Sequence, residues 1–345
     1  MNLFKYLLRR LLILIPTLFG ITCVVFVIIN LAPGGPIDQK LQALRFGGAQ
    51  SSNSSGFSQS SDTAVSEEVI LALKKQYGFD KPLYFRYFLW IKNLIKLDFG
   101  ESFTYEEPVI NVIKSKLPVS LQFGIISFLL VYLICVPLGV LKAIKNGSTF
   151  DILSSFLLFI MYSIPPFMLG ILLIVFFAGG SFFDWFPIGG LYSDQYETLS
   201  LMGKISDRFY HFILPLVCYM IGSFTTLTIL MKNSLLDEIK KDYIRTARAK
   251  GLSDGKIYLK HGLRNALIPI ATGIGNFLMV FFAGSMLLET LFQLDGMGLL
   301  GYKSVLSRDY NVIMGIVFIQ SLFFLIGNIL SDLAYVTVDP RIDFS

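Results

Sequence analysis

Six long runs of residues without charged side chains are the strongest constraint on how this chain folds. They lie at residues 11–31, 117–141, 152–178, 212–231, 266–288 and 311–331. Each has about the 20 residues that an α-helix needs to cross a bilayer. Because backbone polar groups in hydrocarbon must pair within their own segment, such runs fold as helices. The sequence therefore predicts an all-α, polytopic membrane protein with six transmembrane helices.

Composition supports a membrane protein independently of these runs. Hydrophobic residues make up 54% of the chain and charged residues 15%, whereas soluble domains have about a quarter charged residues. Prolines inside the runs each remove a backbone donor, which predicts kinked helices packed against one another rather than isolated anchors. These prolines are Pro16, Pro137, Pro165, Pro166 and Pro215.

The distribution of Lys and Arg predicts the orientation in the membrane. Fifteen lie on the side of the N-terminus, nine of them in the loop at 232–264, and four lie in the two shorter loops of the opposite side. Positive charge marks cytoplasmic loops, and long loops are excluded from this rule. Both termini and the 232–265 loop are therefore expected in the cytoplasm. The net charge of +5 reflects this topology, and no nucleic-acid partner is expected.

The chain divides into four parts on this basis. Residues 1–31 form the cytoplasmic N-terminus and first span, 32–116 a large periplasmic loop, 117–331 the transmembrane core, and 332–345 a cytoplasmic tail. Within the periplasmic loop, helical patterns lie at 66–77 and 84–97. The insert at 47–63 is dominated by Gly, Ser, Gln and Asn, which predicts disorder.

A basic segment from Lys232 to Pro269 has the pattern of two short helices joined at a glycine. Asp237 and Glu238 are expected to open the first helix, and Gly251 to end it in a left-handed conformation. Ser253 is expected to cap the second helix. An apolar side of this second helix is predicted from Ile257, Leu259 and Leu263. A positively charged loop that serves only topology is the plainer interpretation.

The residues of this segment resemble the coupling loop of ABC importer permeases of the peptide transporter family. The similar stretches are Tyr243-Ile-Arg-Thr-Ala-Arg-Ala-Lys-Gly251-Leu-Ser253 and His261-Gly-Leu-Arg-Asn-Ala-Leu-Ile-Pro269. The chain departs from the general pattern of such loops. Arg245-Thr246-Ala247 replaces Glu-Ala-Ala, and Leu263-Arg264 replaces Leu-Pro, as in the first, B-type permease of peptide systems. The resemblance implies that the loop docks on a cytoplasmic ATPase. It assigns this contact to Tyr243, Arg245, Thr246, Ala247, Arg248, Ala249, Lys250, Gly251, Leu252 and Ser253.

Other motifs extend the resemblance over nearly the whole chain. They lie at 9–16, 31–36, 77–82, 98–102, 307–310 and 338–344. The stretch at 171–181 and the closing Asp-Pro-Arg-Ile-Asp-Phe look most like the Yej-type branch, which is associated with uptake of oligopeptides and microcin C. The resemblance implies a bacterial inner-membrane permease subunit. Its implied partners are a second homologous permease, cytoplasmic ABC ATPase subunits, a periplasmic or extracellular substrate-binding protein, a peptide substrate and membrane lipid.

The sequence contains no convincing catalytic, cofactor or metal motif. Asp98-Phe99-Gly100 and the stretch 298–304 match kinase and nucleotide-loop patterns only by chance, because the accompanying motifs and spacing are absent. Cys23, Cys135 and Cys218 lie within predicted spans without metal-type spacing. No ionisable side chain lies in the middle of a span, which argues against an ion-coupled transporter. We therefore expect a transport subunit without enzyme activity, driven through a partner.

Two further functions remain open. A permease for another solute, such as a nickel chelate, would share the coupling loop and differ in its pathway. A channel or membrane scaffold outside the ABC class would use the basic loop to bind lipid headgroups or a protein other than an ATPase.

Overall fold

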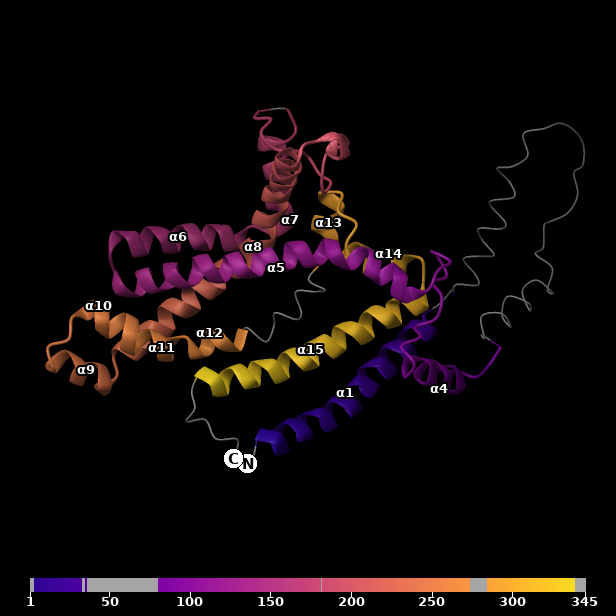
Figure 1. Ribbon diagram of the computed structural model, residues 1–345, viewed down its shortest axis with the longest axis horizontal. Helices are drawn as coiled ribbons and strands as arrows, with labels where there is room; N and C mark the ends of the chain where they lie inside the picture. The colour runs from indigo at the N-terminus through magenta and orange to yellow at the C-terminus, as the bar shows by residue number, and fades with distance from the viewer. Residues whose placement is uncertain (1–2, 33–34, 36–79, 181, 274–283, 339–345) are drawn as a thin grey trace, which may run out of the picture. The chain divides into compact units, whose positions relative to one another are not determined.

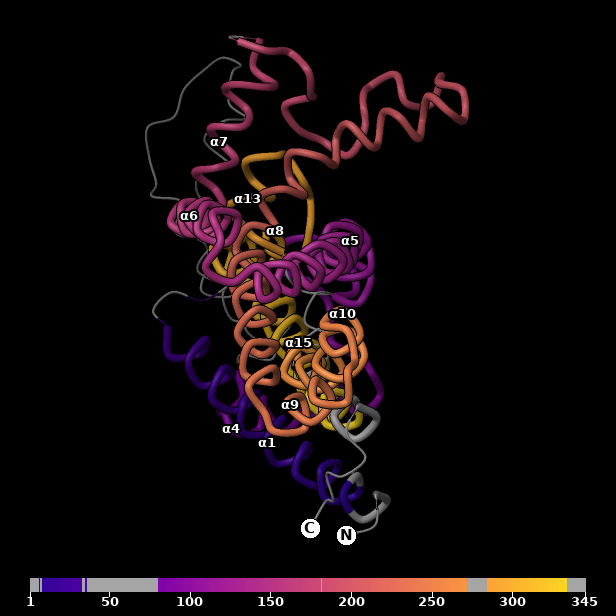
Figure 2. Tube along the Cα trace, turned by 90° about the vertical axis from the view of Figure 1, so that its left-hand side faces the viewer, coloured from indigo at the N-terminus to yellow at the C-terminus, as the bar shows by residue number. Residues whose placement is uncertain are grey.

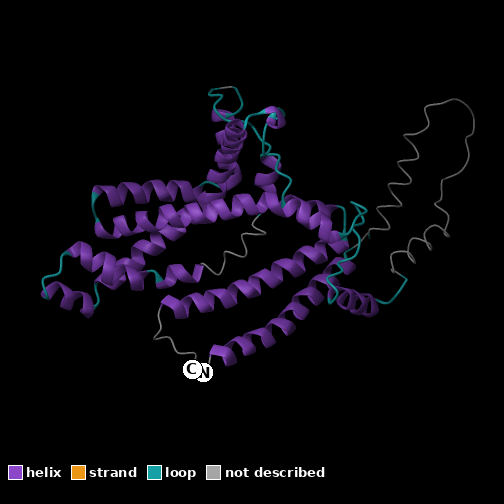
Figure 3. Ribbon diagram, viewed as in Figure 1, coloured by secondary structure: helices purple, strands orange, loops and turns teal. Residues whose placement is uncertain are grey.

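The computed structural model describes residues 3–32, 35, 80–180, 182–273 and 284–338, and the regular elements among them are helices (Figures 1 and 3). The predicted helix at 66–77, the insert at 47–63 and the second half of the C-terminal tail lie outside these residues. The chain forms two compact units. The first unit comprises the chain to residue 13, residues 116–300 and the chain from 322, and the second unit comprises 14–115 and 301–321.

Four long helices confirm four of the predicted spans. They are α1 (Leu3–Leu31), α5 (Val109–Ile144), α8 (Leu201–Ile239) and α15 (Tyr310–Val338), and each contains an apolar stretch long enough to cross a membrane. At 1.5 Å per residue, α5 and α8 are about 55 Å long, which exceeds the hydrocarbon thickness of about 30 Å. These two helices therefore begin well before the predicted starts at 117 and 212.

The third predicted span is broken. Residues 152–178 fall into α6 (Thr149–Ser163) and α7 (Pro166–Phe177), and the two helices are bent by 98°. Pro165 and Pro166 cause the break, because Pro165 has extended backbone angles and Pro166 opens α7. The predicted kink is thus confirmed here, whereas Pro16, Pro137 and Pro215 lie inside continuous helices.

The fifth predicted span is only partly described. Short helices α12 (Ile268–Thr272) and α13 (Met286–Leu291) lie near its ends, and residues 274–283 fall outside the described part. The described helices give four spans, or five if the bent pair is one. The prediction of six spans therefore stays a prediction.

Helix α8 organises the first unit, since α6, α7, residues 257–266 and α12 all contact it. One apolar cluster joins α5, α8 and α12 through Val131, Met231, Leu235 and Ile270. A second cluster joins α5, α7, α8 and α13 and includes Phe123. Apolar side chains along α6 are exposed, as expected of a surface that faces hydrocarbon.

The second unit is built around aromatic contacts. Helix α4 (Leu83–Leu94) confirms the helix predicted at 84–97, although it ends earlier. Tyr87 stacks on Trp90 and also contacts Phe19 and Phe26 of α1, and Trp90 meets Phe318 of α15 edge to face. A further short helix, α14, spans Met297–Leu306.

The close approach of α5 and α8 depends on Gly139. A Cβ at this position would lie 2.6 Å from Met231 Cβ and 2.7 Å from the carbonyl oxygen of Thr228. We expect Gly139→Ala to lower stability by about 1–3 kcal/mol, because the backbone oxygen cannot move aside as a flexible side chain can. Thermal unfolding of the detergent-purified protein measures this loss. Gly222→Ala on α8 is the control, since nothing lies within 4 Å of a Cβ there; equal melting temperatures for both variants would contradict the packing argument.

Candidate functional site

The basic segment forms a chain of short helices at the end of α8 (Figures 1 and 2). It contains α9 (Asp242–Ala249), α10 (Asp254–Lys256), the π-helical turn η2 (Ile257–Gly262) and α11 (Leu263–Ala266). We call residues 242–266 the α9–α11 segment. The prediction that Asp237 and Glu238 open the first helix is wrong, because both lie in the last turn of α8 and Asp242 begins α9.

Gly251 separates the two helical parts as predicted. Its φ is +80°, in the left-handed region that favours glycine, and its N–H donates to the carbonyl of Arg248 at 3.0 Å. Ser253 occupies the N-cap position of α10, which confirms its predicted place. Its hydroxyl makes no capping hydrogen bond.

Buried apolar side chains fix the α9–α11 segment to α8. Ile244 of α9 and Ile257 of η2 are fully buried, and Gly262 packs close to Leu235 of α8. The prediction for Leu259 is wrong, because this side chain is 58% exposed. Residues 257–262 form a π-helical turn, which is wider than an α-helical one and shifts the register of the side chains.

A hydrogen-bond cluster around Glu238 joins the end of α8 to both parts of the segment. The Tyr243 hydroxyl donates to Glu238 Oε2 at 2.6 Å, and Asn265 Nδ2 donates to the Tyr243 hydroxyl at 3.1 Å. Lys241 pairs with the other carboxylate oxygen of Glu238. Burial, together with this carboxylate, raises the pKa of Tyr243 to about 12. The hydroxyl therefore stays a donor at physiological pH.

Most of the residues assigned to ATPase contact from the sequence are exposed. Arg245, Thr246, Arg248, Ala249, Lys250, Gly251, Leu252 and Ser253 are exposed, and Ala247 is half-buried. Tyr243, the remaining residue of the set, is 39% exposed, and its hydroxyl is bonded to Glu238. We call residues 245–253 the docking surface. Its ion pairs, Arg245 with Asp242 at 3.5 Å and Arg248 with Asp254 at 3.2 Å, are exposed and contribute about 1 kcal/mol or less each. The arginines can thus exchange partners at little cost.

A buried ion cluster connects α5, α6 and α8. Asp151 of α6 pairs with Lys232 of α8 at 2.7 Å and with Lys142 of α5 at 3.1 Å. Lys142 is fully buried, and its ammonium group also donates to the hydroxyls of Ser154 at 2.6 Å and Ser155 at 2.8 Å. The sequence does not predict this cluster, because both lysines lie at the ends of apolar runs and count among the positive charges of the flanking loops. Asp151 and Lys232 are far apart in the chain, so no local pattern reveals their pairing.

Within the described ranges, no three His, Cys, Asp or Glu side chains converge so as to hold a metal ion. Cys135 and Cys218 are buried among apolar residues, which is a common place for a free thiol.

Comparison with known proteins adds a family match. The family described as "Binding-protein-dependent transport system inner membrane component" matches residues 135–344. Inner membrane ABC transporter permease protein YejB of Escherichia coli O157:H7 is 46% identical, with 98% of each chain covered. Peptidoglycan transport system permease protein YejB of Agrobacterium fabrum has the same identity and coverage. Oligopeptide transport system permease protein AppB of Bacillus subtilis is 35% identical, over 98% of this chain and 99% of its own.

The ion cluster gives the first test of this region. Asp151→Asn leaves Lys142 buried without a counter-charge, and we expect it to lower the free energy of unfolding by about 3 kcal/mol. Thermal unfolding in detergent measures the change. Asp237→Asn is the matched control, because the Asp237–Lys240 pair is 77% and 76% exposed and spans 3.9 Å, so its loss changes stability by about 0.5 kcal/mol or less. Similar losses in the two variants would show that the cluster does not stabilise the fold.

Proposed function

Because this chain belongs to the family of binding-protein-dependent transport system inner membrane components, we propose that it pairs with a second homologous permease to form a pathway for oligopeptide import. It is a multi-pass inner-membrane transport subunit and not an enzyme. The energy for import then comes from ATP hydrolysed by separate cytoplasmic subunits, and the peptide is delivered by a periplasmic or extracellular binding protein.

The names of similar proteins support peptides as the substrate class. AppB is named for oligopeptide transport and the Agrobacterium protein for peptidoglycan transport, and the chain covers each almost completely. A nickel chelate is the second solute to consider, and it has no such support among these relatives. Uptake of a labelled tripeptide, measured beside uptake of nickel in the same cells, distinguishes the two.

The coupling mechanism is supported by the difference in burial between the exposed docking surface and the residues that attach it to α8. The surface is exposed and basic, whereas Ile244, Ile257 and Glu238 are buried, and the hydroxyl of Tyr243 on α9 donates to Glu238 of α8. A push on the surface by a closing ATPase therefore moves α8 with it rather than unfolding the segment. We place this surface and both chain termini in the cytoplasm, as the distribution of Lys and Arg predicts.

The buried ion cluster extends this route. Lys232 lies on α8 between Met231 and Leu235 of the first apolar cluster, and its bond to Asp151 ties α8 to α6. Displacement of α8 is thus transmitted to α6, and through Lys142 to the end of α5. Rigid-body motion of this kind is a known way of switching a pathway between two access states.

Replacement of Gly251 tests the coupling role. We expect Gly251→Trp to abolish peptide uptake by the assembled importer while ATP hydrolysis persists, because a bulky side chain at a φ of +80° distorts the docking surface. Uptake and ATP hydrolysis are measured together in proteoliposomes.

Gly180→Trp is the matched control for this variant. Gly180 has a φ of +67° and follows α7, and a Cβ added there, like one added at Gly251, would have nothing within 4 Å. Strain and bulk are therefore similar in the two variants, and only Gly251 lies on the docking surface. Coupled uptake in Gly251→Trp, or equal uncoupling in both variants, would refute the role of the docking surface.

Co-purification tests the partners. We expect the tagged chain, extracted from its native cells, to bring down a second permease and ATPase subunits, identified by mass spectrometry. Gly251→Trp should weaken recovery of the ATPase and leave recovery of the second permease unchanged. Recovery of the chain alone, with no ATP hydrolysis in the eluate, would favour the channel or scaffold function, in which the basic docking surface binds lipid headgroups.

A further inference from the structure

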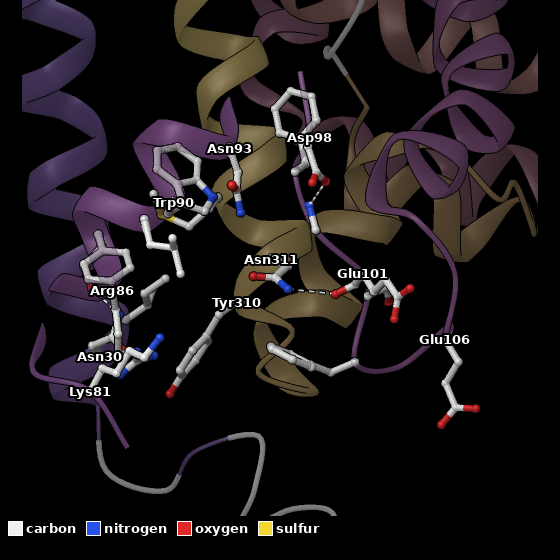
Figure 4. Close-up of a pocket in the computed structure, with 18 residues that line it drawn as sticks. Asn30, Lys81, Arg86, Trp90, Asn93, Asp98, Glu101, Glu106, Tyr310 and Asn311 are labelled. Carbon is white, nitrogen blue, oxygen red and sulfur yellow. Dashed lines mark hydrogen bonds between the residues drawn. The ribbon is translucent and has the colours of Figure 1, made fainter. Parts of the chain in front are cut away.

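The second unit contains a cavity of about 620 Å³, whereas the docking surface and the ion cluster belong to the first unit. Its walls come from the end of α1, from α4, from the turn at residues 98–106 and from the first turns of α15 (Figure 4). Small-molecule sites in proteins usually have volumes of about 300 to 1,000 Å³, so this cavity is large enough for a ligand.

The charged side chains of the cavity are separated by sign. Lys81 and Arg86 come from the beginning of α4 and the residues before it, whereas Asp98, Glu101 and Glu106 come from the turn. Figure 4 shows the two groups on opposite sides of the cavity. A ligand with one charge would be repelled by one of the groups, whereas a ligand with a cationic end and an anionic end is attracted by both.

Uncharged side chains also line the cavity, and one of them is an unsatisfied donor. Leu89, Trp90, Phe103 and Met314 contribute apolar surface, and Asn30, Asn93 and Asn311 contribute amide groups. The indole N–H of Trp90 is buried and has no hydrogen-bond partner among the described residues. Because most buried donors in native proteins are paired, a group that binds here is expected to supply an acceptor to this nitrogen.

The turn with the acidic side chains is held in a strained conformation. Leu97 and Glu106 have φ angles of +59° and +53°, which are unfavourable for residues other than glycine. The fully buried carboxylate of Asp309 fixes the turn by accepting hydrogen bonds from the Ser102 hydroxyl at 2.5 Å and the Thr104 N–H at 3.1 Å. Strain maintained in this way is common where a binding surface is held ready for a ligand.

We propose that this cavity binds short peptides with free termini, with the ammonium end toward Asp98 and Glu101 and the carboxylate end toward Lys81 and Arg86. This inference rests on the proposed function, because it takes the imported class of substrate as the ligand. An extended tripeptide is about 10 Å long and carries carbonyl groups that accept from Trp90 Nε1. A phosphatidylethanolamine headgroup has the same two charges, but only two methylene groups separate its phosphate ester from its ammonium group, so it is shorter.

The test uses the full-length chain in nanodiscs of phosphatidylglycerol, which has no cationic headgroup. The sequence has two tryptophans, so Trp185→Phe leaves Trp90 as the only indole. We expect trialanine to change the Trp90 fluorescence in a saturable manner, and N-acetyl-trialanine amide, which lacks both terminal charges, to have no effect. Trp90→Phe with Trp185 retained should give no response to either peptide.

Variants of exposed residues test the two charged groups. Lys81→Met and Glu101→Gln are each expected to raise the Kd for trialanine about tenfold, because each removes one charged contact. Lys92→Met on α4 and Glu107→Gln beside the turn are the matched controls. Both are exposed and neither lines the cavity, so their Kd values should equal that of the parent protein.

Two results would overturn the inference. One is a missing response to trialanine, or an equal response to the blocked peptide. The other is a Trp90 signal that changes when phosphatidylethanolamine replaces phosphatidylglycerol but not when trialanine is added, which would assign the cavity to a lipid headgroup. Coupled uptake without trialanine binding would refute this inference alone, whereas trialanine binding without coupled uptake would refute only the proposed function.

Discussion

The carboxylate of Asp151 is the interaction on which the first unit depends most. It is the counter-charge of two lysines from two other helices, Lys142 at 3.1 Å and Lys232 at 2.7 Å. Buried charges are tolerated only when they are paired and their remaining donors are satisfied. Ser154 and Ser155 accept two further hydrogen bonds from Lys142, so the cluster meets both conditions. Loss of the carboxylate would leave two like charges close together in a largely buried region.

Within the proposed function, this cluster also explains how movement of the α9–α11 segment would reach α6. Apolar contacts around Met231 and Leu235 join α8 to α5 and α12, and they resist separation but not sliding. The ion pairs of Asp151 are directional, so they fix the position of α8 along α6. Together, the two kinds of contact make these helices move as one body when the docking surface is pushed. The exposed ion pairs of Arg245 and Arg248 are weak by comparison and leave the surface available for a partner.

The sequence predicted those features that depend on local chemistry. Apolar runs identified the long helices, the proline pair at 165–166 identified the kink, and Gly251 identified the left-handed turn. Helix ends were less predictable, because charged residues such as Lys116 and Lys204 lie within continuous helices outside the apolar stretches. Glu238 was assigned to the wrong helix, since an acidic pair can open one helix or end another. The exposure of Leu259 follows from a π-helical turn that has no signature in the sequence.

Long-range pairing explains the remaining differences. Thr225 makes a helix-to-helix hydrogen bond, because its hydroxyl donates to the carbonyl of Leu158 at 2.8 Å. Its neighbour Thr226 has another environment. It lines a second cavity, of about 490 Å³, beside α5 and α8. Adjacent threonines on a helix face different sides, and the partners on each side cannot be deduced from the sequence alone.

The lining of this second cavity is consistent with a pathway that accepts peptides of varied sequence. Its described residues include the hydroxyls of Ser127, Tyr132, Ser223 and Thr226, and none of them is charged. A fixed charge would favour peptides of opposite charge and reject the others, whereas hydroxyl groups can donate to or accept from any peptide backbone. Within the proposed function, recognition of the charged termini therefore belongs to the cavity at Lys81 and Glu101. Passage through the helices needs only groups that form hydrogen bonds with the N–H and C=O groups of the peptide backbone.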